Sequence, residues 1–177
     1  MGDRCDECGF DYEALAVADA VDELRRLGRR YRAPLTRFLR DEDGDAVVRA
    51  HPLAGTWSAL EYACHLRDVL DVQRERLAVA LAEDTPSFEP MGREERVVRD
   101  RYNEQDPAEV AGQVAVNGEA LADTVEAMTE DQLARTAIYG YPQEQERTLA
   151  WVVRHTVHEG EHHLLDVGRV LRAARGR

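Results

Sequence analysis

The chain has 177 residues, of which 44% are hydrophobic and 33% charged, a balance typical of one globular domain with a buried core. Its formal net charge of −12 argues against nucleic-acid binding, because contacts to phosphates require a basic face. No apolar run approaches the length of a membrane span and the N-terminus lacks the apolar core of a signal peptide, so we expect a cytoplasmic protein without membrane contacts.

Residues 1–11 form a short N-terminal segment that precedes the domain, which we place at residues 12–177. The segment contains Cys5 and Cys8 followed by Gly9, a CxxC turn that supplies half of the ligands of a small zinc site. Two other interpretations stay open, namely a redox-active thiol pair and a tail that the domain does not need.

The first long helix is predicted over about residues 15–39, where apolar residues recur at steps of three and four and Pro34 kinks or divides the helix. A second helix begins near residue 56 and continues to about residue 81, with Ser58 and Glu61 at the spacing of a capping box. His65 lies inside it on a largely apolar face. A lone histidine there is more often a hydrogen-bonded core residue than a ligand, so its role depends on a partner cluster elsewhere.

Residues 84–106 form an unusually long connection, which we interpret as a crossover or as a loop over a site, with a short helix near residues 94–101. A third long helix begins after Asp106, an N-cap residue that is followed by Pro107 at the first turn.

The last part of the chain contains a short capped helical turn at residues 129–133 and an extended stretch at residues 135–141 that is too short to predict a sheet. The final helix runs from its cap, Thr148, to about Ala174. Four long amphipathic helices without a convincing strand pattern predict an all-α protein, a four-helix bundle.

Four of the six histidines lie within residues 155–163 of the final helix, together with two glutamates. Imidazole and carboxylate groups are the ligands of zinc, nickel, manganese and non-haem iron. At about 100° per residue, Glu159 and His163 fall on the inward side of the helix, and Gly160 between them leaves room for another atom or ligand. The other three histidines project to the opposite side: His155, His158 and His162.

His65 and the inward pair form a set of two histidines and one carboxylate on facing helices. Three protein ligands leave coordination positions open, as in a reactive metal site. The alternative is a buried network of Glu–His hydrogen bonds without metal. The opposite side also has two interpretations: His158 and His162 are solvated, or they meet Cys5 and Cys8 in a closed Cys2His2 zinc site.

Two motifs resemble the DinB/YfiT-like superfamily, most closely its branch with mycothiol-dependent maleylpyruvate isomerase: WSxxEYxxHLxDV at residues 57–69 and HExxHHLxDV at residues 158–167. The resemblance covers about residues 12–174. It implies a bacterial four-helix bundle whose divalent metal, commonly zinc or nickel, is held by a histidine of the second helix and two residues four apart on the last. That pair is His/His in many members and Glu/His in the isomerase branch, which implies His65, Glu159 and His163 as ligands.

By this resemblance we expect a metal-dependent thiol transferase or isomerase, in which the metal lowers the pKa of a thiol such as mycothiol and presents it to an electrophilic substrate. Asp68 and Asp166 are candidates for orienting the histidines; the alternative is that both are solvated on the helix surfaces. We expect no counterpart of the additional C-terminal domain of the full isomerase, so maleylpyruvate is not the expected substrate. The CxxC opening is a second departure from the general family pattern. Two alternatives have no turnover: a metal-stabilised binding or stress-response module, and a homodimer with purely structural metals.

Overall fold

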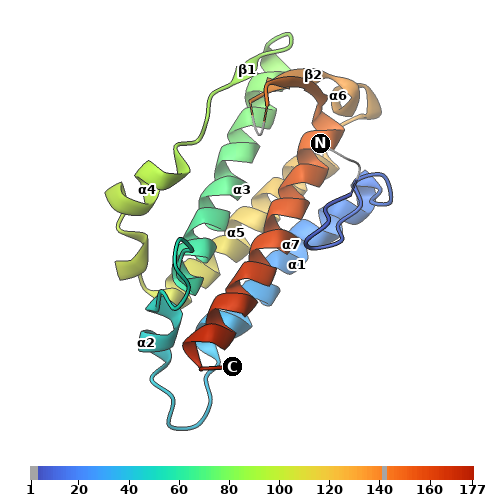
Figure 1. Ribbon diagram of the computed structural model, residues 1–177. Coiled ribbons are helices and arrows are strands. Elements are labelled where there is room, and N and C mark those ends of the chain that lie inside the picture. The colour runs from blue at the N-terminus through green and yellow to red at the C-terminus, as the bar shows by residue number, and fades with distance from the viewer. Residues whose placement is uncertain (1–3, 141–142) are drawn as a thin grey trace.

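The computed structural model describes residues 4–140 and 143–177, and its core is a bundle of four long helices (Figure 1). The fold confirms the predicted four-helix bundle. The long helices are α1 (Val17–Thr36), α3 (Ala59–Ala82), α5 (Pro107–Glu126) and α7 (Leu149–Ala174). Shorter helical segments lie between them: α2 (Gly44–Arg49), α4 (Arg93–Arg99), the 3-10 helix η1 (Tyr102–Glu104) and α6 (Glu130–Ala134).

Side-chain caps fix where three of the four long helices begin. Ser58 and Glu61 form the predicted capping box at the start of α3, and Asp106 accepts two backbone N–H groups at the start of α5. Thr148 caps α7 in the same way. Helix α1 ends earlier than predicted, at Thr36, so Pro34 lies in its last turn and does not divide a longer helix.

The order of the helices around the bundle differs from their order in the chain. Helices α1 and α3 each pack against both α5 and α7. Helices α3 and α5 run in the same direction, so residues 83–106 must return along the outside of the bundle from one end to the other (Figure 1). The prediction that this long connection is a crossover is confirmed.

A small sheet lies at the end of the bundle where α3 ends and α7 begins (Figure 1). Its strands are β1 (Ser87–Phe88), β2 (Thr136–Tyr139) and β3 (Gln145–Thr148); β2 pairs in parallel with β1 and antiparallel with β3. The prediction that residues 135–141 form no sheet was therefore wrong. The sequence did not show it because β1 has only two residues and β3 is polar and largely exposed. The last residue of the predicted stretch, Tyr141, lies outside the described residues.

Small residues let α1 and α5 approach closely. A Cβ atom on Gly28 of α1 would lie 2.4 Å from the Cβ of Ala115 on α5, and one on Gly118 of α5 would lie 2.8 Å from the carbonyl oxygen of Leu24. Such contacts are shorter than van der Waals distance, so the helix spacing requires glycine there. Within the described residues, no helix combines the length and apolarity needed to cross a membrane.

Gly28→Ala is expected to lower the free energy of unfolding by about 1–3 kcal/mol, the usual effect of overpacking a core, since the new methyl group would meet the backbone of Ala115. The matched control is Gly112→Ala on α5, where a Cβ has open space. It should stabilise the protein by about 0.5–1 kcal/mol through helix propensity alone. Urea unfolding followed by circular dichroism measures both variants, and equal effects would contradict the close approach of α1 and α5.

Candidate metal centre

Helices α3 and α7 bring the three predicted inner ligands together. His65 comes from α3, and Glu159 and His163 lie one turn apart on α7. One ligand atom from each lies within 4.8 Å of the other two. The Nε2 atom of His163 is 3.5 Å from Glu159 Oε2, and the rings of His65 and His163 have centroids 5.0 Å apart. We call these three residues the inner group.

The inner group has the kinds of donor atom that a divalent metal requires. His163 Nδ1 lies 3.2 Å from Asp166 Oδ2, so this carboxylate holds the ring with Nε2 toward Glu159. His65 is buried, and its Nδ1 has no hydrogen-bond partner among the described residues. A buried imidazole with an unpartnered nitrogen, beside a carboxylate and a carboxylate-oriented histidine, fits a divalent cation such as zinc or nickel.

Burial and charge set the protonation of the inner group. Burial lowers the pKa of His65 to about 3, which keeps this imidazole neutral and able to donate a lone pair. Burial also disfavours charge on His163, but its hydrogen bonds with Asp166 and Glu159 outweigh that effect and raise its pKa to about 9. Burial raises the pKa of Glu159, yet the hydrogen bond from His163 and the nearby His155 bring it below its usual range. Without metal, His163 and Glu159 therefore form an ion pair, and a metal that binds there must displace the proton of His163.

The two aspartates that were candidates for orienting histidines have different roles. Asp166 contacts His163 as predicted. Asp68 instead accepts hydrogen bonds from the Tyr102 hydroxyl at 2.5 Å and from Arg67 at 2.7 Å, and it pairs with Arg96 at 3.3 Å. Asp68 therefore anchors the crossover to α3, and its predicted contact with a histidine was wrong.

The space beside Gly160 is filled by α1. A Cβ atom on Gly160 would lie 2.6 Å from Leu27 Cδ2, and the Tyr31 hydroxyl donates to the Gly160 carbonyl at 2.9 Å. The expectation that Gly160 leaves room for a ligand was therefore wrong, because this glycine serves the contact between α1 and α7.

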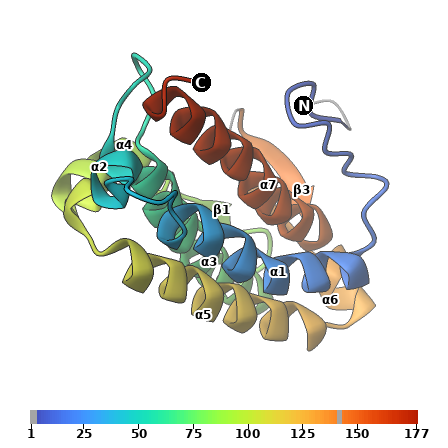
Figure 2. The ribbon, with the colours of Figure 1, turned by 90° about the horizontal axis from the view of Figure 1, so that it is seen from below.

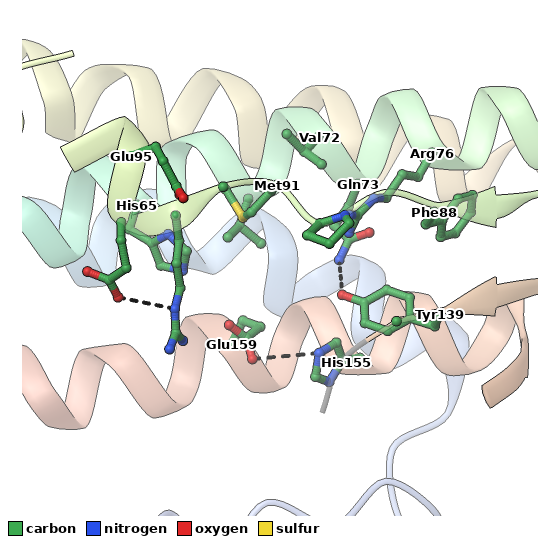
Figure 3. Close-up of a pocket in the computed structure, with 16 residues that line it drawn as sticks. His65, Val72, Gln73, Arg76, Phe88, Met91, Glu95, Tyr139, His155 and Glu159 are labelled. Atoms are coloured by element: carbon green, nitrogen blue, oxygen red, sulfur yellow. Dashed lines mark hydrogen bonds and ion pairs between the residues drawn. The ribbon is translucent and has the colours of Figure 1, made fainter. Parts of the chain in front are cut away.

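The open space next to the inner group is a cavity of about 310 Å³ between α3, α7 and the crossover (Figure 3). His65 and Glu159 line one end of it, and Arg76, Phe88 and Tyr139 lie toward the other. The crossover supplies a wall that includes Pro90, Met91 and Gly92. The long connection therefore covers this cavity.

Gln73 and Arg76 are among the polar residues of the cavity that were missed from the sequence, and the crossover contributes others. Gln73 donates to the Tyr139 hydroxyl at 2.8 Å, and its other amide atom, Oε1, is buried without a partner among the described residues. The Arg76 guanidinium lies 5.4 Å from the ring centroids of both Phe88 and Tyr139. The sequence feature that could have identified them is their spacing. Gln73 and Arg76 follow His65 by eight and eleven positions, which places all three residues on one face of α3.

The opposite side of α7 is not a solvated surface. His158 is only 4% exposed, so the solvated interpretation was wrong for it. His155 is 1% exposed and lines the cavity beside Glu159, so its predicted place on the opposite side was wrong. The N-terminal segment covers this side and brings Cys5 and Cys8 to His158 and His162, as the other interpretation required.

A third group of residues with side chains that can bind metal consists of His155, His158 and Glu159. The Tyr12 hydroxyl lies 2.8 Å from the Nδ1 atoms of both histidines, so these nitrogens already have a hydrogen-bond partner. This combination is a hydrogen-bonded network between the two other groups.

Comparisons with known proteins bear on the family and the fold of the chain. A family model described as the DinB superfamily matches residues 23–167. The chain is similar in structure to YfiT from Bacillus subtilis, described as a probable metal-dependent hydrolase with an unusual four-helix bundle topology, with a TM-score of 0.78 and 15% sequence identity. That likeness covers 88% of this chain and 86% of YfiT. No curated protein matches the chain in sequence.

His65→Ala is expected to reduce the zinc or nickel content of the purified protein by about one equivalent per chain, because the inner group loses one of its three ligands. The matched control is His51→Ala, a half-exposed loop histidine that hydrogen-bonds to Glu61 and belongs to none of the ligand groups among the described residues. Elemental analysis of the two variants measures the difference. Unchanged metal content in His65→Ala would show that the inner group holds no metal.

Proposed function

The chain belongs to the DinB superfamily, and on that premise we propose that it is a metal-dependent enzyme that catalyses transfer or isomerisation with a small thiol such as mycothiol. The observation that carries this proposal is the position of the inner group at the end of a cavity. Zinc sites of enzymes keep a coordination position open, whereas structural sites are closed by four protein ligands. His65, Glu159 and His163 supply three ligands, and two of them line the cavity.

A divalent metal in the inner group would lower the pKa of a thiol or water that takes the open position. The protein side chains have distinct tasks around it. Asp166 keeps His163 in the orientation that presents Nε2, and burial keeps His65 neutral. The crossover covers the cavity from solvent on one side.

The cavity suits a small substrate with an apolar body and a polar end. Its volume of about 310 Å³ lies at the lower end of the range for small-molecule sites. Val69, Val72 and Phe88 offer apolar walls. Away from the inner group, Arg76 offers a cation and Gln73 offers an amide oxygen that has no partner among the described residues. An electrophile with a carboxylate would have its charge met by Arg76 and its reactive end near the inner group.

Metal-dependent hydrolysis is the second candidate, favoured by the structural likeness to YfiT and its description as a probable metal-dependent hydrolase. It uses the same inner group, with water in place of the thiol. A metal-stabilised binding module without turnover is the third. The three differ in their response to thiols and esters.

Adding N-acetylcysteine to the cobalt-substituted protein is expected to increase thiolate-to-cobalt absorption in the near ultraviolet, because the open position of the inner group accepts the thiol. His65→Ala should abolish the increase, and His51→Ala should keep it. Ultraviolet–visible titration measures the response. If thiol does not change the absorption but the protein hydrolyses activated esters in a way that depends on His65, hydrolysis replaces thiol transfer as the proposed function. If the protein shows neither the absorption change nor ester hydrolysis, the binding module without turnover is the remaining candidate.

Arg76→Gln is expected to weaken binding of a small dicarboxylate such as maleate to the metal-loaded protein by at least about tenfold, since a hydrogen bond to a charged group contributes about 1.5–3 kcal/mol. The matched control is Arg74→Gln, an exposed arginine two residues away whose partner is Asp71 at 2.9 Å. Isothermal titration calorimetry measures both affinities. Equal affinities would place the anionic end of the substrate elsewhere.

A further inference from the structure

The N-terminal segment docks on α7 at the face opposite to the cavity. Figures 1 and 2 show residues 4–16 beside α7, on the far side from the crossover. Tyr12 is 6% exposed and stacks on Trp151 with ring centroids 5.7 Å apart, and Phe10 packs against His158 at 5.2 Å. Arg154 donates to the carbonyl of Leu15 at 2.7 Å. These contacts fix the N-terminal segment and the residues that follow it, up to Leu15, on the bundle.

A tight turn within this segment places two thiols on one side. The Gly9 N–H donates to the Cys5 carbonyl and the Cys5 N–H donates to the Phe10 carbonyl, each at 2.8 Å. Gly9 has a φ of +76°, in the left-handed region that favours glycine. An antiparallel bridge between Arg4 and Asp11 closes the turn. Cys5 and Cys8 are therefore held together before any ligand binds.

The two thiols face two imidazoles of α7. One ligand atom each from Cys5, Cys8, His158 and His162 lies within 4.8 Å of all the others. Cys5 Sγ is 3.7 Å from His162 Nδ1. Zinc–sulfur and zinc–nitrogen bonds of about 2.3 and 2.0 Å at a tetrahedral angle place the two ligand atoms roughly 3.6 Å apart. The observed spacing therefore fits two ligands of one ion.

Both imidazoles have one nitrogen engaged away from the thiols. His158 Nδ1 lies 2.8 Å from the Tyr12 hydroxyl, whereas its Nε2 is buried and has no partner among the described residues. His162 Nε2 lies 3.7 Å from the carboxylate of Glu7, between the two cysteines in sequence, and its Nδ1 faces Cys5. A metal-bound histidine almost always donates its other N–H to such a partner. Without a cation, the buried His158 Nε2 remains unsatisfied.

From these four ligands we propose a second metal site, a closed Cys2His2 zinc site made by Cys5, Cys8, His158 and His162 that joins the N-terminal segment to α7. Two thiolates and two imidazoles in tetrahedral reach are the ligand set of structural zinc. Four protein ligands leave no position for substrate, so the site stabilises the segment and takes no part in turnover. It shares no residue with the inner group.

The double variant Cys5→Ser/Cys8→Ser is expected to lose one zinc equivalent per chain relative to wild type while its circular dichroism keeps the helical signal of the bundle. The matched control, Cys64→Ser, changes a buried cysteine of α3 outside the ligand groups of the described residues and should lose none. Elemental analysis of the full chain, purified with reductant, measures both. Equal zinc in the double variant and wild type, or a Cys5–Cys8 disulfide that persists in reductant, would overturn the proposal.

Two adjacent histidines, His162 and His163, allow the two proposed sites to be tested separately. In cobalt-substituted protein without added thiol, wild type should show thiolate-to-cobalt absorption from the two cysteines. His162→Ala is expected to weaken this band strongly, whereas His163→Ala, which removes an inner ligand, should keep it. A wild-type protein without the band, or a band that follows His163 instead of His162, would overturn the proposal, whatever the outcome for the inner group.

Discussion

The periodicity of α7 is the constraint on which both ligand groups depend. Residues 155–163 carry four histidines, and 100° per residue divides them between two faces of one helix. Glu159 and His163 face α3 and the cavity, and His158 and His162 face the N-terminal segment. Both faces are largely buried, so each imidazole needs a partner for its polar atoms. One helix therefore requires a cover on each side, and the chain supplies α3 for one and residues 4–16 for the other.

A short series of hydrogen bonds and close contacts joins the two faces. The Tyr12 hydroxyl contacts both His155 Nδ1 and His158 Nδ1 at 2.8 Å, and His155 Nε2 lies 3.6 Å from Glu159 Oε1. The hydroxyl has one proton, so at least one imidazole must donate to it. If His158 gives Nε2 to the proposed zinc, its Nδ1–H donates to Tyr12, which then donates to His155. The N–H of His155 is left to face Glu159, an inner ligand, so the outer site fixes the direction of every proton in the series.

The sequence predicted what short-range periodicity and capping control. The long helices, the cap at Ser58 and the pairing of Glu159 with His163 follow from three- and four-residue spacing. It could not predict features set by tertiary packing. The sheet needs Ser87–Phe88 beside residues fifty positions away, Gly160 is opposite Leu27, and Asp68 is opposite Tyr102. The helical spacing from His65 could have placed Arg76 on the same face of α3. Its place in a cavity, however, depends on the crossover, which contributes Phe88.

Coordination number separates the roles proposed for the two groups. The inner group has three ligands, two of which line a cavity, and a pair of them, His163 and Glu159, must lose a proton when a metal binds. The outer group has four ligands from two parts of the chain, with thiolates that bind zinc strongly. A metal with four protein ligands adds its binding free energy to the contacts that hold the segment on α7, whereas a metal with three can bind substrate at its open position. The same helix can therefore hold a stable anchor and a reactive centre only because its two faces present different ligand numbers.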